Sequence, residues 1–376
     1  MTTELPATIM VACGAAYNLL AIASALRFKM RHRRTPRFRP PVSILKAVKG
    51  RDDGFYEAIR SHAAQDYPKF EILFGVADLV DPAVADIERL RREFPEIPIQ
   101  VIATPNDAPN RKAGSLDILA SRARYDVLLV NDGDILVPPC YLANVLDCLE
   151  DDAVGLVTCI YRGRGGSFPA RAEALGIGTE FAPSVLVARL ISSSGFALGS
   201  TMAFRRRELD AIGGFPAIRE YLADDYQLGA RISALGKRIV MPNVVVETNL
   251  GSGTLSQVWR HQVRWSRTIR ISRPGGYLGY VVTHATFWCL VAALTGGWQV
   301  ALLGLGVRLA AAGAALAALE AALSSLPAVP FRDLAGFAVW CAGLFGNTVE
   351  WRGERFRLLR DGRMLSLKSA DPVATR

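Results

Sequence analysis

The sequence lacks several patterns that would indicate common kinds of site. Its six cysteines form no Cys-x-x-Cys pair and show no metal-ligand spacing, which argues against a zinc site and a disulfide framework and fits a reducing compartment. No Gly-x-Gly-x-x-Gly or Gly-x-x-x-x-Gly-Lys-Ser/Thr segment follows the first predicted strand, so dinucleotide-binding and P-loop folds lose support. Internal repeats and low-complexity tracts are also absent.

Charged residues are absent from Ala7–Leu26, a run of 20 residues, and a membrane-spanning helix needs ~20 residues. A signal peptide has its basic residues before the apolar run, whereas here Glu4 precedes the run and seven Lys or Arg follow it within residues 27–39. We therefore expect an uncleaved signal anchor, after which the positive-inside rule places residue 27 onward in the cytoplasm. This topology explains the net charge of +9 better than nucleic-acid binding does.

A second long stretch, Pro274–Val307, also lacks Lys, Arg, Asp and Glu. A Gly-Gly pair at 296–297 marks a turn inside it and predicts two membrane helices, roughly Tyr277–Thr295 and Trp298–Leu319. The second helix contains Arg308, which must snorkel to the membrane surface or face a partner.

A third apolar run, Leu334–Val349, is only 16 residues long and is followed by the basic segment WRGERFRLLRDGR. If this run spanned the membrane, the basic segment would lie outside the cell, against the positive-inside rule. A re-entrant or interfacial segment would keep it inside. We favour that interpretation, although the sequence alone leaves both open.

Between the membrane segments, short apolar strands alternate with helical stretches. The strands are rich in Val, Ile and Leu without polar alternation: Val42–Ala47, Phe70–Val76, Ile99–Ala103 and Asp126–Asn131. Helical patterns lie near residues 54–65, 82–94 and 111–122. This order predicts an α/β domain whose parallel sheet is covered by helices on both faces. Ligands of such sheets bind beyond the carboxyl ends of the strands.

Carboxylates follow two of these strands. Asp78 follows the second strand, where the alternative role is that of a turn or helix-capping acid. The fourth strand runs directly into Asp132-Gly133-Asp134. Two carboxylates two residues apart, on a turn opened by glycine, can converge on one divalent cation whose shell is completed by water and phosphate oxygens. Such a cation would neutralise a departing diphosphate, whereas the alternative is a polar turn without a ligand.

Asp225 lies in a Tyr-Leu-Ala-Asp-Asp-Tyr segment that leads into a predicted helix reaching Leu235. It can cap that helix and complement its dipole. A carboxylate fixed there against a pocket can also accept a proton from an acceptor hydroxyl. The two roles are compatible, and we favour both.

A basic helical segment, SQVWRHQVRWSRTIRISR, precedes the second apolar stretch and contains His261, Arg264 and Trp265. An amphipathic helix on the membrane surface would explain its cations and aromatic residues. Arg264 can equally clamp a diphosphate, and Trp265 can form a wall of an acceptor site.

Together these residues resemble the ceramide glucosyltransferase family of GT-A glycosyltransferases, and especially its bacterial relatives assigned to hopanoid biosynthesis. The resemblance covers nearly the whole chain. It rests on the ordered set Asp, Asp-x-Asp, Asp-Asp and x-x-Arg-Trp, which is specific as a set although each element alone is weak. Val42–Gly50 is similar to the family's opening strand and its Lys-x-x-Lys-Gly, and Arg332–Val339 and Glu350–Gly353 are close to the hopanoid-associated branch.

The resemblance implies a role for each matching residue. Asp78 is expected to hold the uridine of a UDP-sugar donor, and Asp132 with Asp134 to bind the diphosphate and a divalent metal, Mg²⁺ or Mn²⁺. Asp225 is expected to be the catalytic base. The remaining donor-site residues that the resemblance implies are Asn110, Lys112, His261, Arg264 and Trp265.

Two positions depart from the family pattern. His261 stands where eukaryotic members carry Gln or Arg, although bacterial relatives resemble this chain there. A histidine that many members carry after a Gly-Thr pair is absent, because this chain reads Gly-Thr-Glu-Phe at 178–181. That position lies on the acceptor side of the site in the resemblance, so its loss bears on acceptor identity more than on catalysis.

The resemblance implies an inverting transfer of a hexose from a UDP-sugar to a ceramide- or hopanoid-type lipid at the cytoplasmic face of the bacterial inner membrane. The chain would divide into an anchor and basic linker (1–39), a cytoplasmic GT-A domain ending in the interfacial helix (40–273), membrane segments (274–350) and a basic tail (351–376). The alternatives are a processive polysaccharide synthase of related architecture and a non-catalytic membrane protein that binds nucleotide sugars. No nucleic-acid-binding motif is present.

Overall fold

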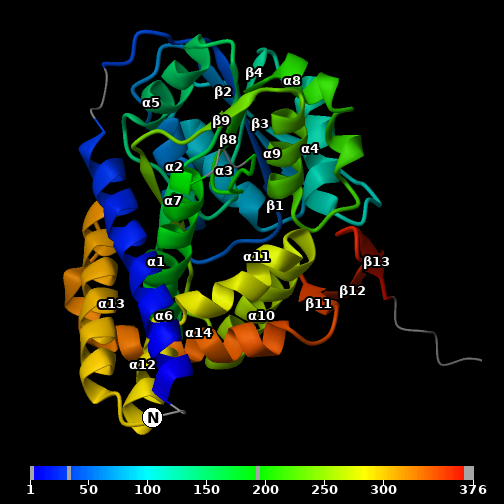
Figure 1. The fold of residues 1–376 in the computed structure, drawn as a ribbon. Helices are drawn as coiled ribbons and strands as arrows, with labels where there is room; N and C mark the ends of the chain where they lie inside the picture. The colour runs from blue at the N-terminus through cyan, green and yellow to red at the C-terminus, as the bar shows by residue number, and fades with distance from the viewer. Residues whose placement is uncertain (1–3, 32–34, 192–194, 368–376) are drawn as a thin grey trace, which may run out of the picture.

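The computed structural model describes residues 4–31, 35–191 and 195–367. Its centre is a seven-stranded sheet of order β3-β2-β1-β4-β8-β6-β9, in the upper half of Figure 1. β1 to β4 pair in parallel, as predicted, whereas β8 runs antiparallel to its neighbours β4 and β6. The sheet is therefore mixed rather than wholly parallel. Its strands are β1 Val42–Val48, β2 Phe70–Val76, β3 Ile99–Ala103, β4 Val127–Val130, β6 Val154–Val157, β8 Met202–Arg205 and β9 Arg238–Val240.

Helices cover both faces of this sheet, which is why the side chains of its central strands are buried on both faces and mostly apolar. Ile44 and Ile72 contribute to a core shared with α2 and α3. Leu45 and Leu73, one residue later in each strand, contribute to a second core with α4 and α9. The alternation of side chains along each strand thus builds two cores. The helices of this half are α2 Phe55–Ala63, α3 Ala83–Glu93, α4 Arg111–Arg122, α5 Tyr141–Asp147, α8 Arg206–Ala211 and α9 Asp224–Ala234.

Two three-stranded sheets complete the β structure. One has the order β5-β10-β7 and is built from β5 Ile135–Leu136, β7 Ile160–Arg164 and β10 Val245–Asn249. The other is the antiparallel C-terminal sheet, built from β11 Thr348–Trp351, β12 Glu354–Leu358 and β13 Met364–Ser366.

The C-terminal sheet includes most of the predicted basic tail, which begins at residue 351. Apolar side chains alternate with arginines along the sequence, and a strand places such residues on opposite faces. Phe356, Leu358 and Met364 are buried against Leu222 in a small core. The described part of the segment is therefore folded, while residues 368–376 of the predicted tail and residues 32–34 of the predicted basic linker lie outside the described residues.

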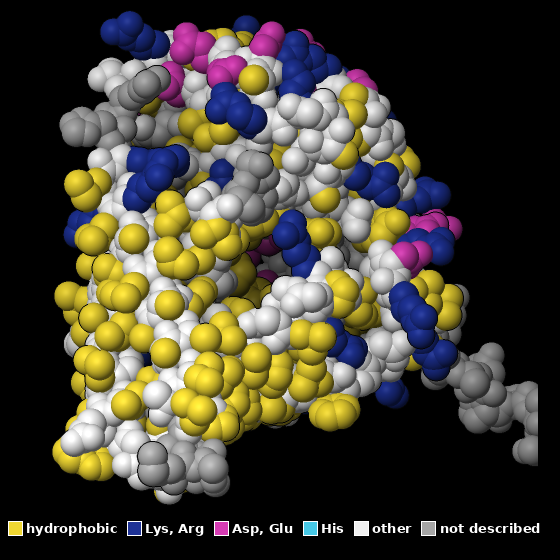
Figure 2. All heavy atoms as spheres, in the orientation of Figure 1, with side chains coloured by type: hydrophobic (Ala, Val, Ile, Leu, Met, Phe, Trp, Pro, Cys, Tyr) yellow, Lys and Arg dark blue, Asp and Glu magenta, His cyan; other side chains and the backbone are white. Residues whose placement is uncertain are grey.

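Long apolar helices form a bundle on the other side of the molecule. α1 Glu4–Met30 packs along α13 Trp298–Ala318, at the lower left of Figure 1. Within the described residues, three helices are long and apolar enough to cross a membrane by length and composition: Leu5–Met30, Phe168–Ile191 and Trp298–Ala318. Figure 2 shows hydrophobic side chains crowded over this bundle, whereas charged side chains gather around the sheet.

Two of these three helices agree with the predicted membrane segments, but Phe168–Ile191 was assigned to the cytoplasmic domain. It consists of α6 Phe168–Gly176, the π-helical turn η2 Ile177–Phe181 and α7 Ala182–Ile191. Four charged residues, two basic and two acidic, interrupt its apolar character in the sequence. The helix packs inside the bundle, where 56% of its most apolar 18-residue stretch is buried. This packing accommodates the four charged residues.

The predicted membrane helix Tyr277–Thr295 is wrong as a single helix. α11 Pro274–Gly279 and a 3₁₀ turn, Tyr280–Thr283, are bent by 50° from α12 Ala285–Leu294. The two parts pack on different neighbours, α11 on α10 Leu255–Ser272 and α12 on α13, which accounts for the bend.

The third apolar run forms α14 Val329–Gly343, a helix of 15 residues. It packs against α10, α12 and α6. Its length falls short of the ~20 residues that a spanning helix needs, in agreement with a segment that does not cross the membrane. A re-entrant or an interfacial position remains the prediction.

Candidate active site

The candidate site lies at the carboxyl ends of β1, β2 and β4. Val48 pairs with Val76, and Leu45 pairs with Val130, so the segments after these strands emerge at one edge of the sheet. The predicted acidic positions 78 and 132 belong to these segments. Figure 2 shows a hollow in the middle of the molecule with acidic side chains inside it.

Buried polar groups hold the turn Asp132-Gly133-Asp134 in place. Asn131, just before it, donates from Nδ2 to the carbonyl oxygen of Ser200 at 2.7 Å and to Tyr141 Oη at 2.9 Å. Lys46 Nζ donates to the carbonyl oxygen of Asp132 at 3.2 Å. Burial lowers the pKa of Lys46 to about 7, against the opposing charges of the two aspartates. The turn therefore has a fixed support that does not depend on a ligand.

Asp132 and Asp225 come together from distant parts of the chain. Asp225 Oδ2 accepts a hydrogen bond from the Gly199 amide at 2.9 Å. A Cβ atom at Gly199 would lie 3.1 Å from Asp132 Oδ2 and 3.4 Å from Asp225 Oδ2. Both carboxylates therefore face the same backbone segment, and only glycine leaves their oxygens unobstructed.

Lys112, in the first turn of α4, joins the carboxylates. Its Nζ lies 2.7 Å from Asp132 Oδ1 and 3.3 Å from Asp224 Oδ2. Burial acts to lower the pKa of Lys112, but the charges of Asp132 and Asp224 outweigh it and raise the pKa above its ordinary value. This lysine is therefore a permanent cation among acidic groups.

Asp225 lies in the first turn of α9, whose N-cap position is Ala223. The predicted capping role is therefore wrong, because the Asp225 carboxylate instead accepts from the amides of Gly199 and Tyr226. Burial, followed by the charge of Asp224, raises the pKa of Asp225 to about 6. A buried carboxyl group with a pKa near neutrality is suited to accept a proton.

Asp134 lies deeper than Asp132, and the Thr248 hydroxyl donates to its Oδ2. Burial and then the charge of Asp132 raise the pKa of Asp134. In residues 4–31, 35–191 and 195–367, no three His, Cys, Asp or Glu side chains lie close enough to hold a metal ion by themselves. A carboxylate pair in which one charge raises the pKa of the other fits a divalent cation, provided that a ligand such as a diphosphate supplies further oxygens.

Asn110 and Asp78 have local roles in the structure. Asn110 is buried; its Oδ1 accepts from the Ala113 amide at 3.0 Å and caps α4, and its Nδ2 donates to the carbonyl oxygen of Tyr221 at 2.8 Å. It thereby positions the helix that carries Lys112. Asp78 is exposed and accepts from the Val80 amide at 3.1 Å, and no ion pair within the described residues joins it to the acidic cluster.

The basic segment forms α10, which brings Arg264 and Trp265 to the site. Burial lowers the pKa of Arg264 to about 10, while the charges of Glu173 and Asp132 act in the opposite direction. His261 Nδ1 lies 2.7 Å from Glu173 Oε1, and its ring centre lies 4.6 Å from that of Trp265. His261 is therefore held between a carboxylate and an aromatic ring.

A largely apolar cavity of about 260 Å³ lies beside Trp265, between α6–α7, α10, α11 and α14. Arg332 provides a polar wall, with Nη2 3.1 Å from Gln262 Oε1 and 3.4 Å from Glu180 Oε2. Its Nε and Nη1 atoms are buried without a hydrogen-bond partner. An apolar space with a few unsatisfied polar groups is typical of a site for an amphiphilic ligand. The apolar lining includes Phe181, Trp265, Ile269, Tyr277, Val339 and Trp340.

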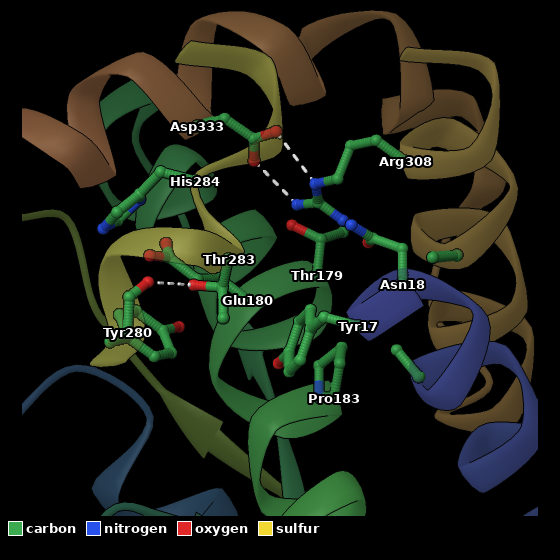
Figure 3. A pocket seen from close by; sticks show the side chains of 12 residues that line it. Tyr17, Asn18, Thr179, Glu180, Pro183, Tyr280, Thr283, His284, Arg308 and Asp333 are labelled. Carbon is green, nitrogen blue, oxygen red and sulfur yellow. Dashed lines mark hydrogen bonds and ion pairs between the residues drawn. The ribbon is translucent and has the colours of Figure 1, made fainter. Parts of the chain in front are cut away.

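A smaller cavity of about 10 Å³ lies within the bundle (Figure 3). Arg308 forms a two-pronged ion pair with Asp333 there, Nε–Oδ2 at 2.9 Å and Nη2–Oδ1 at 2.6 Å. Of the two alternatives predicted for Arg308, facing a partner is therefore confirmed. Glu180, labelled in Figure 3, lines both cavities.

Several residues of this arrangement are not among the predicted site residues. A lysine inside an apolar strand, such as Lys46, is a feature that sequence reasoning can use, because buried lysines need a reason. Gly199 gives no such indication, since its role depends on two carboxylates from other segments. Glu173 and Arg332 are ordinary residues of apolar helices until the fold places them beside α10.

Known proteins resemble this chain over most of its length. The family model described as Glycosyl transferase family 21 matches residues 7–364. Ceramide glucosyltransferase 1 of Caenorhabditis elegans is 23% identical over 356 residues, which cover 89% of this chain and 75% of that protein. Ceramide glucosyltransferase 3 of the same organism is 25% identical over 230 residues, which cover 60% of this chain and 50% of that protein.

A solved structure shares the fold. The mannosyltransferase PcManGT from Pyrobaculum calidifontis, in complex with GDP-Man and Mn²⁺, is 22% identical and superposes with a TM-score of 0.57. The match covers 91% of this chain and 97% of that chain. The sheet half described above is accordingly a GT-A-like α/β glycosyltransferase fold, in agreement with the fold class predicted from the sequence.

Proposed function

Since the chain belongs to glycosyl transferase family 21, we propose that it transfers a hexose from a UDP-sugar to the hydroxyl group of a membrane lipid. Glucose and N-acetylglucosamine are the proposed sugars, and a ceramide- or hopanoid-type lipid is the proposed acceptor. The observation that carries the proposal is the meeting of Asp132, Lys112 and Asp225 at the carboxyl edge of the sheet. The relatives named ceramide glucosyltransferases support a lipid acceptor.

The donor would bind along the sheet edge from Asp78 to Asp132. Lys112 and Arg264 are the cations that would face its diphosphate. Asp132 and Asp134 would hold Mg²⁺ or Mn²⁺ together with diphosphate oxygens, and such an ion neutralises the charge of a leaving diphosphate. Electrostatic stabilisation of the departing group is a large contribution to this kind of catalysis.

Asp225 is proposed as the general base. It removes the proton of the acceptor hydroxyl while the hydroxyl oxygen bonds to the anomeric carbon and the bond from that carbon to the diphosphate breaks. UDP leaves from the opposite face, so the transfer inverts the anomeric configuration. Burial favours this role because it raises the pKa of Asp225 to about 6, close to the pH at which a base must work.

The acceptor would occupy the apolar cavity beside Trp265. Its walls belong to helices that reach the apolar bundle, so a lipid could arrive without leaving the membrane. The proposed location is the bacterial inner membrane, with the sheet half in the cytoplasm. Three helices of suitable length and composition support a membrane protein.

Two conservative substitutions test the proposal in the full-length protein. Asp225→Asn should keep the affinity for UDP-sugar but lose about 10²–10⁴ in turnover, the usual contribution of general-base catalysis. Asp132→Asn should instead weaken donor binding in the presence of Mn²⁺. The measurements are UDP release and mass analysis of the lipids formed, with the exposed Asp210→Asn on α8 as the control.

Several outcomes would contradict the proposal. Near-normal turnover of Asp225→Asn would remove the assigned base, and unchanged donor affinity of Asp132→Asn would remove the metal role. A water-soluble oligosaccharide product would indicate a processive synthase instead. Binding of UDP-sugar without release of UDP, in the presence of lipid extract, would indicate a non-catalytic binding protein.

A further inference from the structure

The C-terminal sheet is fastened to the segments that build the donor site. Arg111 at the start of α4 pairs with Glu354 of β12, with Nη2 and Oε1 3.0 Å apart. The Met364 amide of β13 donates to the carbonyl oxygen of Glu220 at 2.7 Å. These contacts tie the sheet both to the helix that carries Lys112 and to the segment that precedes Asp225.

The β11–β12 hairpin points its tip toward the same edge. Lys49 Nζ, directly after β1, donates to the carbonyl oxygen of Arg352 at 3.4 Å. Helix α10, which carries Arg264, packs against β11, and the charge of Arg352 acts on Arg264. The end of β1, helix α10 and the hairpin therefore lie side by side, and each contributes one cation.

Arg352 is an unusual residue for its position. It and Gly353 form the two-residue turn with φ of 51° and 84°, a geometry for which Asn, Asp and Gly are the favoured residues. Outside glycine, Arg352 and Glu320 are the residues with positive φ in the part of the chain that the structure describes. The turn does not favour an arginine, so the reason for the residue lies in its side chain, whose guanidinium carbon lies 5.8 Å from the centre of the Trp351 ring.

The three cations also lack acidic partners. Lys49, Arg264 and Arg352 form no ion pair with a carboxylate within the described ranges. Arginine and lysine side chains without a carboxylate partner are suited to bind an anion, and guanidinium groups match phosphate oxygens especially well.

We propose that Arg352 is a donor-binding residue, which binds the diphosphate of the nucleotide sugar from the C-terminal hairpin, together with Lys49 and Arg264. The C-terminal sheet is then a cap on the donor side of the cleft rather than a surface appendage. This inference rests on the proposed function for the identity of the sugar nucleotide, but the ligand chemistry that it needs is a nucleoside diphosphate alone.

UDP and uridine are the probes that test it, in the full-length protein in detergent with Mn²⁺. Arg352→Ala should weaken UDP binding, measured by calorimetry, about tenfold or more, as expected for the loss of a charged hydrogen bond. Uridine, which has no phosphate, should bind the variant and the wild type equally. Arg360→Ala, in the exposed turn at the other end of the same sheet, makes the same charge change and should keep the wild-type UDP affinity.

A second substitution separates the charge from the turn. Arg352→Asn introduces a residue that favours positive φ, so it should keep or raise the melting temperature while losing UDP affinity as the alanine variant does. In a transfer assay, both variants should raise the KM for UDP-sugar and leave the KM for lipid unchanged.

The outcomes distinguish this inference from the proposed function. Wild-type UDP affinity in both Arg352 variants would overturn the inference while leaving the glycosyltransferase proposal intact, as would an equal loss in Arg360→Ala. Absence of transfer by the wild type with every UDP-sugar, with UDP affinity still dependent on Arg352, would overturn the proposed function and support the inference.

Discussion

The sheet edge and the helical bundle both bury charged side chains, but they balance the charges differently. At the sheet edge, Asp132 and Asp224 both pair with Lys112, and Asp225 lies beside them. Asp132 keeps 42% of its side chain exposed. In the bundle, Arg308 and Asp333 match one to one, and each side chain is only 6% exposed. The first cluster has an acidic excess beside an open cleft, whereas the second is closed.

This difference favours the first cluster as a ligand-binding site and the second as a contact that stabilises the fold. A buried ion pair with matched charges and direct hydrogen bonds has no free charge with which to bind a ligand. Removing one partner leaves the other charge buried and unpaired, which is destabilising. An unbalanced cluster keeps perturbed pKa values and can bind a ligand of opposite charge. Groups with perturbed pKa values are common in active sites. Arg332, with two unsatisfied N–H groups, lies between the two regions and faces the apolar cavity.

Breaking the pair in the bundle is the sharpest test of the comparison. Arg308→Ala should destabilise the protein by about 3–5 kcal/mol, because Asp333 would remain buried without a partner. Arg91→Ala, which removes an exposed pair with Glu88 on α3, should cost about 0.2–1 kcal/mol. Unfolding of the detergent-solubilised protein, followed by temperature or denaturant, measures both.

The double variant Arg308→Met/Asp333→Leu controls for the loss of charge. It should recover most of the stability, since apolar residues of similar volume often replace a buried pair without loss. Equal costs for Arg308→Ala and Arg91→Ala would show that the bundle pair contributes no more than a surface pair.

Filling the apolar cavity separates the acceptor side from the donor side. Val339→Trp places a large ring in the space beside Trp265 and should lower kcat/KM for the lipid about tenfold or more, because displaced acceptor contacts are lost. The KM for UDP-sugar should not change, since no aspartate of the acidic cluster lines this cavity. Kinetics with each substrate varied in turn provide the measurement.

Leu334→Trp on the same helix is the matched control, because Leu334 is exposed at 36% and does not line the cavity. Its kinetics should match those of the wild type. A rise in donor KM for Val339→Trp, or an equal effect of both substitutions on the lipid, would contradict the assignment of the cavity to the acceptor.

The two regions also differ in how far the sequence predicts them. β1 to β4 and the carboxylates after them follow from local patterns, because a buried strand and the turn after it are set by neighbouring residues. The meeting of Asp132 and Asp225 depends on the unpredicted antiparallel strand β8, since Gly199 lies just before it. Because Phe168–Ile191 contains charged residues, the sequence did not predict that this helix packs into the bundle. Because the C-terminal segment is rich in arginine, the sequence did not predict that it folds as a sheet.

The apolar cavity and the bundle pair could not be predicted from local pattern for a related reason. Arg332 and Asp333 are adjacent in the sequence, yet the first faces the cavity and the second faces Arg308 on another helix. Neighbouring residues on a helix point about 100° apart, so they can serve different partners. The packing of α14 decides which partner Arg332 and Asp333 each contact. The periodicity of the sequence does not indicate this packing.

The smallest expected effect is the pH dependence of the acidic cluster. Burial raises the pKa of Asp225 from 3.8 to about 6, and a general base works only when it is ionised. At saturating donor, the rate of transfer should therefore be halved near pH 6 and fall roughly tenfold per pH unit below it. A constant rate from pH 7 to pH 5 would contradict the assignment.

The raised pKa of Asp225 also predicts how stability depends on pH, and this trend is opposite to that of the transfer rate. The Arg308–Asp333 pair should not share it. Because the folded state holds the proton of Asp225 more tightly than the unfolded chain does, this group makes the protein less stable as the pH rises between 3.8 and about 6. Asp225→Asn cannot ionise, so it should remove that part of the slope, and its reduced turnover should no longer depend on the titration of this group. Melting temperatures across this range measure the effect, and an unchanged slope in Asp225→Asn would show that the carboxyl group titrates as it does in water.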